Sequence, residues 1–255
     1  MIYIYIYRIL DIHMFQQIWT YQLPYGLTIK GFSRGSQNTG FVIPELKLMF
    51  DAQMRSDSCS HIFITHGHTD HIFSLPMRIC NVPKQPIVCI PNEIKEMTKK
   101  FIDSVYQLGY HNPEYSYQCN LIGVKDNDII PINSTYRAKV YELDHSVPCR
   151  GYGIQRIKTK LKQEYQNLPK EEIIKLKKQK IQITEEIIEN IFAYLTDTQP
   201  TIFTKYPELL TYEYIMTECT FLPIDDPERK NILKAKEAKH THWDDLYSIM
   251  EKHPQ

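Results

Sequence analysis

The stretch HIFITHGHTDHI, residues 61–72, decides how this sequence is interpreted. Its first half is apolar and β-branched, which is typical of a buried strand. Four potential metal ligands follow directly: His66, His68, Asp70 and His71. Residues at i and i+2 of an extended chain point to the same side, so the first two histidines are placed to bind one cation as the strand ends. Asp70 and His71 lie past the turn, and we expect them to face a second cation.

Imidazole nitrogen combined with carboxylate oxygen is the ligand set of zinc, with manganese or iron as alternatives. The competing interpretation is a histidine-rich surface loop, but Gly67 favours a metal site because it lets the backbone approach an ion closely. Two distant residues are expected to complete the set. His145 follows the strand AKVYELD and Asp197 follows IFAYLT. Each comes at the carboxyl end of a predicted strand, where sites on α/β sheets gather, although either alone would more often be an ordinary loop residue.

Two cations held close together can activate a water and stabilise the charge that builds on a phosphoryl group. This donor set therefore predicts phosphodiester hydrolysis. Asp197 is placed to bridge the cations, and Asp70 to orient or deprotonate the water as general base.

The rest of the chain predicts one α/β domain over residues 1–255, built as a layered sandwich. Short β-rich runs separated by turns fill residues 20–155, and further strands are expected at 191–198 and 212–221. A helix is predicted over 92–108 with Asn92 as its N-cap, and another over 227–250. The first ten residues alternate Ile and Tyr, which fits either an edge strand or a wrongly assigned start.

Composition narrows the class of protein. Thirty basic residues balance thirty acidic ones, so net charge gives no reason to invoke nucleic acid or lipid. The six cysteines form no CxxC pair, which favours a reducing compartment. The apolar start is too short to span a bilayer and lacks a secretory pattern, so no membrane is expected and a cytoplasmic location is the default.

One segment departs from this balance. Residues 156–180 hold nine Lys or Arg against three acidic residues. Such a run is either a solvated charged helix or a surface that contacts phosphates.

The motif HGHTDH matches the HxHxDH signature of the metallo-β-lactamase superfamily, and the surrounding sequence resembles the ribonuclease Z family of that superfamily. The resemblance extends over most of the chain. It is carried by IKGFSRGSQNTGFVIPELKLMFDAQ before the signature, LDHSVPCRGYGI around His145, LTDT around Asp197, and TECTF followed by KHTHW.

The resemblance implies a metallo-β-lactamase αββα sandwich and a zinc-dependent endoribonuclease that removes the 3′ trailer of precursor tRNA. It implies two zinc ions per subunit, one bound by His66, His68 and His145 and the other by Asp70 and His71, with Asp197 as bridge. Asp70 would also accept the proton, and Glu218 and His240 would together protonate the leaving oxygen. His242 is a poorer match than His240. Without the resemblance, Glu218 and His240 would be taken as solvated surface.

The same resemblance interprets residues 155–185 as an inserted, protruding arm that clamps tRNA. The residues expected to bind nucleic acid are Lys158, Lys160, Lys162, Lys175, Lys177 and Lys178. Lysines held away from the body contact phosphates without reading sequence. The family also implies a homodimer in which one subunit's arm serves the other's active site.

Three features of the sequence depart from the family pattern. Thr196 replaces the usual glycine before the bridging aspartate, the arm lacks its tip glycines, and the family continues past Gln255 to a histidine that is the last ligand of the second zinc. We therefore interpret the chain as truncated at its C-terminus, with a weaker second zinc site. The alternatives are a non-catalytic or weakly active tRNA-binding paralogue and a general phosphodiesterase.

Overall fold

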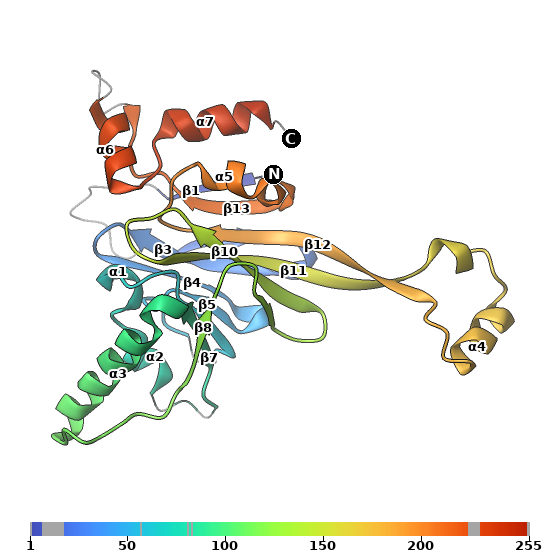
Figure 1. The fold of residues 1–255 in the computed structure, drawn as a ribbon, viewed down its shortest axis with the longest axis horizontal. Helices are drawn as coiled ribbons and strands as arrows, with labels where there is room; N and C mark the ends of the chain where they lie inside the picture. The colour runs from blue at the N-terminus through green and yellow to red at the C-terminus, as the bar shows by residue number, and fades with distance from the viewer. Residues whose placement is uncertain are drawn as a thin grey trace.

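Two β-sheets pack face to face in the computed structural model, which describes residues 2–6, 18–56, 58–80, 82, 84–223 and 230–253 (Figure 1). The seven-stranded sheet has the spatial order β2 (Trp19–Gln22), β3 (Thr28–Arg34), β4 (Asn38–Ile43), β5 (Leu48–Phe50), β6 (His61–Phe63), β7 (Ile87–Pro91) and β8 (Asn120–Val124). The six-stranded sheet has the order β1 (Ile2–Ile6), β13 (Tyr214–Glu218), β12 (Thr184–Leu195), β11 (Cys149–Leu161), β10 (Tyr136–Leu143) and β9 (Ile129–Pro131).

Helices cover the outer face of each sheet (Figure 1). On the seven-stranded sheet lie α1 (Thr69–Ile72), α2 (Leu75–Ile79) and α3 (Lys95–Tyr110), and on the six-stranded sheet lie α5 (Ile202–Lys205), α6 (Lys230–Ala238) and α7 (Trp243–Lys252). Short 3₁₀ turns are η1 (Pro24–Gly26), η2 (Pro44–Leu46), η3 (Asn92–Ile94), η4 (Gln163–Tyr165) and η5 (Pro207–Thr211). The predicted αββα sandwich is confirmed by this layering. No helix among the described residues is long and apolar enough to cross a membrane.

The strands form because their apolar runs are buried on both faces. In the β6 run, Phe63 points into the core between the sheets, while Ile62 and Ile64 point into the helix layer. In β12, Phe192 and Tyr194 enter the central core, and their neighbours Ala193 and Leu195 face α5 and α7. Continuous burial of this kind explains why these segments are uninterrupted apolar runs rather than an alternation of apolar and polar residues.

The strand ends that matter for function gather at one edge. In the first sheet β5, β6, β7 and β8 run parallel, and in the second sheet β12 and β13 run parallel. The loop between the antiparallel strands β10 and β11 reaches the same region. The segments carrying His66, His145, Asp197 and Glu218 therefore meet where these strands end.

The strands β11 and β12 continue far beyond the sandwich as a two-stranded ribbon that ends in η4 and α4 (Lys170–Lys178) (Figure 1). Their register shifts at the root of the ribbon. Ile154 pairs with Phe192, but the next residue, Gln155, pairs with Asn190, so that Ile191 has no counterpart. This β-bulge separates the ladder of the body from the ladder of the ribbon. We call residues 156–189 the arm.

Two predicted helices differ from the observed ones. The single helix over 227–250 is wrong: α6 ends at Ala238 because Lys239 adopts a left-handed backbone with φ of 56°, and a new helix begins at Trp243. The predicted start at 227 lies outside the described residues. Asn92 does not cap α3, because it begins a 3₁₀ turn and Ile94 occupies the cap position. The alternating N-terminal segment does form an edge strand, β1, parallel to β13.

Candidate metal centre

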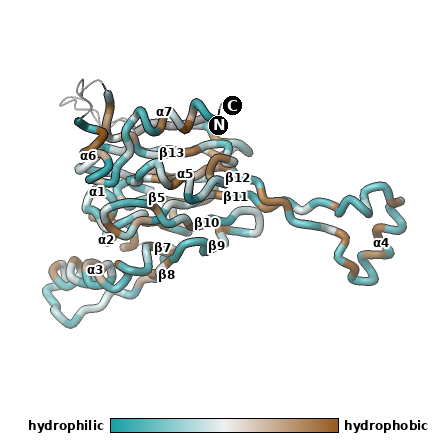
Figure 2. The backbone as a smooth tube through the Cα atoms, turned by 45° about the horizontal axis from the view of Figure 1, so that its top comes forward, coloured by the Kyte–Doolittle hydropathy of each residue, from teal (hydrophilic) through white to brown (hydrophobic). Residues whose placement is uncertain are grey.

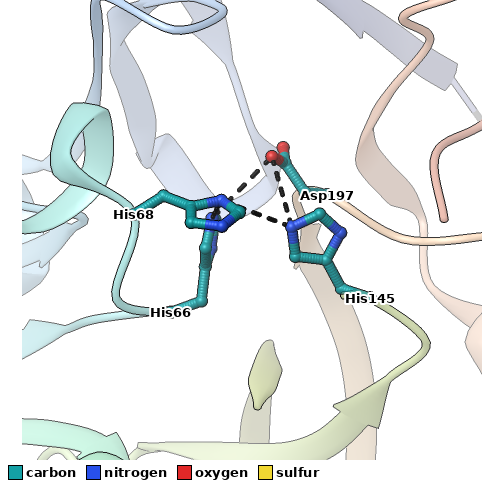
Figure 3. Close-up of side chains that lie close together, drawn as sticks. All are labelled: His66, His68, His145 and Asp197. Carbon is teal, nitrogen blue, oxygen red and sulfur yellow. Dashed lines mark hydrogen bonds and ion pairs between the residues drawn. The ribbon is translucent and has the colours of Figure 1, made fainter. Parts of the chain in front are cut away.

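Four predicted ligands come together at the end of β6 (Figure 3). His66 Nε2 lies 3.0 Å from His68 Nδ1, and His145 Nε2 lies 3.4 Å from the same nitrogen. Asp197 Oδ2 lies 3.8 Å from His66 Nε2 and 3.9 Å from His145 Nε2. All four ligand atoms fall within 4.8 Å of one another. We call these four residues the first donor set.

Hydrogen bonds on the far side of two rings direct the correct nitrogen inward. Thr65 Oγ1 donates to Asp51 Oδ1 at 2.9 Å, so it can accept from the Nδ1–H of His66 at 3.0 Å. His145 donates its Nδ1–H to the backbone carbonyl of Lys239 at 3.2 Å. Both rings therefore present an Nε2 lone pair to the centre, as metal-binding histidines do. Converging lone pairs beside a carboxylate make a donor set that fits a zinc ion.

A second group of donors adjoins the first. His71 Nε2 lies 3.6 Å from Asp70 Oδ2 and 3.9 Å from Asp197 Oδ2. The other ring nitrogen, His71 Nδ1, contacts Asp51 Oδ2 at 2.8 Å. Asp70 is held by the backbone N–H of Ser36, which donates to its Oδ2 at 2.9 Å. Asp70, His71 and Asp197 form the second donor set, and Asp197 is common to both sets.

The histidines of the first donor set are neutral near pH 7. Burial lowers the pKa of His66 well below its ordinary value and lowers the pKa of His145 to about 4. Burial also lowers the pKa of His68. A neutral imidazole is the form that binds a metal, so a cation need not displace a proton from these three rings.

His71 differs from these three histidines. Burial alone would lower its pKa, but the carboxylate of Asp51, assisted by Asp197 and Asp70, raises it to about 9. Burial raises the pKa of Asp197 to about 6, and the adjacent His71 opposes that rise. The second donor set therefore carries a proton on His71 at neutral pH, which a cation would have to displace.

Glu218 and His240 meet beside the first donor set. Glu218 ends β13 and is buried, and its Oε1 lies 2.7 Å from His240 Nδ1. The same carboxylate accepts from the backbone N–H groups of Thr198 and Thr241 at 3.1 and 3.3 Å, and from Thr220. Glu218 therefore anchors the loops around it. Although burial opposes the shift, the Glu218 carboxylate raises the pKa of His240.

The neighbouring histidine has another role. His242 is fully buried and caps α7, because its Nδ1 accepts from the backbone N–H of Asp244 at 3.1 Å. The imidazole ring of His240, in contrast, lies 5.1 Å from the ring of His145. Of the two histidines in the HTH segment, His240 is the one that lies at the site.

Sequence reasoning missed two residues that shape the centre. Asp51 follows β5 and is fully buried. Its carboxylate is hydrogen-bonded to Thr65, to the ring of His71 and to the hydroxyl of Tyr194. It stands directly after a strand, which was also the signal for His145 and Asp197, but no second feature of the sequence singled it out. Lys239 acts through its backbone carbonyl, for which side-chain chemistry gives no signal.

The predicted arm lysines lie in two different settings. Lys158 is in β11 and pairs with Glu189 of β12 at 3.2 Å, and Lys160 stands opposite Glu185 in the ladder. Lys162 follows the end of β11. Lys175, Lys177 and Lys178 lie in the last turns of α4, and no acidic partner is found for them among the described residues. Figure 2 shows that much of the outer arm is hydrophilic.

The return strand changes the charge of the arm. Counting residues 156–189 rather than 156–180 adds Glu185, Glu186 and Glu189, so nine basic residues face six acidic ones. The excess is concentrated at the tip, where residues 170–180 hold five lysines against two glutamates. The cation-rich surface is therefore the tip of the arm, whereas its ribbon is partly neutralised.

The sequence relatives of this chain reported below are named tRNase Z or ribonuclease Z. No family model matches the chain. The tRNase Z TRZ1 of Arabidopsis thaliana is 28% identical over 236 residues, which cover 89% of this chain and 81% of that protein. The nuclear ribonuclease Z of Triticum aestivum is 27% identical over 169 residues, covering 64% of this chain and 94% of that protein. Among solved structures, human tRNase Z, short form (ELAC1), covers 89% of this chain and 82% of its own, with 15% identity and a TM-score of 0.47. Over most of its length the chain is a sequence homologue of the ribonucleases Z.

Proposed function

We propose that this protein is a zinc-dependent endoribonuclease that removes the 3′ trailer from precursor tRNA. The observation that supports this most strongly is the convergence of His66, His68, His145 and Asp197 from three separate segments on one point. The homology to tRNases Z over 89% of the chain selects precursor tRNA among phosphodiester substrates.

The first donor set would hold one zinc, and the second donor set a further one. When bound, zinc lowers the pKa of a water and offsets the charge that develops on phosphate. We expect weaker binding at the second donor set, because among the described residues it offers three side chains rather than four and because His71 is protonated at neutral pH.

Side chains of the protein would carry out the two proton transfers of the reaction. Asp70 would accept the proton of the attacking water, since its Oδ2 lies 3.6 Å from His71 Nε2 while the backbone N–H of Ser36 fixes its position. His240, whose pKa the Glu218 carboxylate raises, would donate a proton to the leaving oxygen. Glu218 acts as a positioning residue, because its oxygens are already occupied by N–H and O–H donors.

The arm would hold the tRNA body through phosphates, with the lysines of α4 as its principal contacts. Backbone contacts of this kind are independent of sequence and weaken with salt. We further propose a homodimer. The arm carries α4 away from the metal centre of its own chain (Figure 1), a placement that suits an arm which serves a second copy.

The test is cleavage of a precursor tRNA by the purified protein loaded with zinc. We expect one cut just after the discriminator base, and Asp70→Ala should lower its rate by about 10³-fold, within the range of general base catalysis. Metal analysis and the mass in solution accompany the assay. Cleavage of a small chromogenic diester without cleavage of the precursor would indicate a general phosphodiesterase, and salt-sensitive tRNA binding without any cleavage would indicate a binding protein.

A further inference from the structure

A pocket of about 600 Å³ opens beside the metal centre and is not used by the steps above. It is lined by the loop between β10 and β11, including His145, by residues of α5, including Lys205 at its end, and by Lys239. Its volume is in the range of small-ligand sites, roughly 300–1,000 Å³, which is too small for a double helix. A group bound there would lie beside His145 and therefore next to the first donor set.

The charges of this pocket are arranged in pairs. Lys205 contacts Glu142 at 2.6 Å, and Lys239 contacts Asp144 at 3.0 Å. Each member of these two pairs has between 40% and 49% of its side chain exposed. Ion pairs this exposed contribute little stability, typically below about 1 kcal/mol, so a ligand can displace one partner at small cost.

A third pair is built into the wall. Arg150 has 3% of its surface exposed, and it donates to Glu93 Oε1 at 2.5 Å and to the carbonyl of Cys149 at 3.0 Å. Its Nε has no hydrogen-bond partner among the described residues. The buried Nε–H is therefore a donor that an acceptor atom of a ligand in this pocket would satisfy.

A paired cation and carboxylate match the two polar groups of a ribonucleotide. The cation suits the phosphate, and the carboxylate accepts a hydrogen bond from the ribose 2′-hydroxyl, the group that distinguishes RNA from DNA. Apart from His145 the lining holds no aromatic ring on which a base could stack. Such a pocket recognises the sugar and phosphate and leaves the base unread.

We propose that this pocket binds a single unpaired ribonucleotide adjoining the scissile phosphate, with Lys205 contacting its phosphate and Glu142 its 2′-hydroxyl. The inference rests on the proposed endoribonuclease function. It adds that the strand next to the cut is selected for its sugar rather than for its base.

The first measurement compares Lys205→Ala with the wild type on precursor tRNA and on a small chromogenic diester. The ratio of the two kcat/KM values should fall about tenfold, and the slope of log kcat/KM against log salt for the tRNA should decrease by about one, as expected for one lost phosphate contact. Lys205→Arg should restore both values. Lys99→Ala is the matched control, because Lys99 is also ion-paired on a helix but lies in the opposite layer. An equal change in Lys205→Ala and Lys99→Ala would overturn the proposal.

The second measurement tests the sugar. Precursors with one 2′-deoxy nucleotide on either side of the cut should be cleaved several-fold more slowly at one of the two positions, and Glu142→Ala should lose this discrimination. Equal cleavage of all substrates by the wild type would refute the ribose contact.

A third measurement separates this proposal from the endoribonuclease function. A diribonucleoside monophosphate should inhibit turnover of the chromogenic diester more strongly than its deoxy analogue, and Lys205→Ala should weaken that inhibition. If the precursor is never cleaved but this pattern holds, the proposed function fails and the pocket assignment stands. If the precursor is cleaved but the ribo and deoxy inhibitors act equally, the pocket assignment fails alone.

Discussion

The metal centre and the tip of the arm solve opposite physical problems. At the centre, the ionisable side chains are buried or half-buried, and neighbours fix the orientation of several of them, as Asp51 fixes His71 and Glu218 fixes His240. At the tip, the lysines of α4 are exposed and are held by no acidic partner among the described residues. Chemistry needs positions accurate to a fraction of an ångström, whereas attraction of a polyanion needs only charge of the correct sign. The two regions should therefore respond differently to substitution.

The largest effect is expected from His66→Ala. Losing this buried donor should abolish zinc binding at the first donor set and lower turnover of both precursor tRNA and a small diester by about 10³-fold or more, because activation of the water fails. Binding of tRNA should persist, since the arm is intact. Zinc content, turnover and a filter-binding assay measure the three effects, with His111→Ala, an exposed histidine after α3, as control. Loss of tRNA binding in parallel with zinc would show that the two regions are not independent.

Shortening the arm should weaken the use of tRNA and leave the metal centre intact, and the effect should be smaller than that of His66→Ala. Replacing residues 158–187 with Asn-Gly would join Ile157 to Ile188, which face each other in the ladder, by a two-residue hairpin. We expect kcat/KM for precursor tRNA to fall about 100-fold at physiological salt, because several phosphate contacts are lost. The shortened protein should keep its zinc and most of its turnover of a small diester. Wild-type cleavage of tRNA by this variant would exclude a binding role for the arm.

The zinc affinities of the two donor sets should depend differently on pH. The pKa of His71 is raised to about 9, so below that pH a cation entering the second donor set must displace its proton. Affinity there should rise about tenfold per pH unit from pH 7 towards 9. His145, with a pKa of about 4, is already neutral over this range, and affinity at the first donor set should stay nearly constant. Titration calorimetry in buffers of different ionisation enthalpy reports the released proton. Two sites with the same pH dependence would contradict the assignment of the His71 proton.

The smallest effects are expected from lysine substitutions in the arm, which compare the contribution of its tip to tRNA binding with that of its ribbon. Lys177→Ala combined with Lys178→Ala should weaken tRNA binding roughly fivefold and reduce the salt slope by about two, since neither lysine is neutralised by a neighbour. Lys158→Ala should change both quantities less, because Glu189 already offsets that charge. A fluorescence-anisotropy titration at several salt concentrations would compare them. If Lys158→Ala has the larger effect, the ribbon rather than the tip holds the RNA.

The sequence was informative where function depends on residues that are close along the chain or that end a buried strand. His66 and His68 could be paired from the i, i+2 rule, and His145 and Asp197 from their places after apolar runs. Asp51 satisfied the same rule but stood alone, so nothing distinguished it from an ordinary turn residue. Its role depends on Thr65, His71 and Tyr194, which only the packed sheets bring together.

Other errors arose where the outcome depends on backbone conformation or on distant pairing. The break at Lys239 needs a left-handed residue that is not glycine, which no propensity indicates. The count over residues 156–180 does not give the charge of the whole arm, because Glu185, Glu186 and Glu189 lie outside that window and reach the lysines only through strand pairing. Local composition describes a segment, but its electrostatic field depends on what packs beside it.

The β-bulge between Ile154 and Gln155 has a consequence for how the molecule can vary. A one-residue slip in a ladder would turn every inward side chain outward, which near the centre would misplace the segments leading to His145 and Asp197. The bulge fixes the pairing of β11 with β12 in the body separately from their pairing in the arm. Residues can therefore be gained or lost in the arm without shifting the segments that lead to His145 and Asp197. The arm can change length over evolutionary time, or be grafted between relatives, while the chemistry at its base is inherited unaltered.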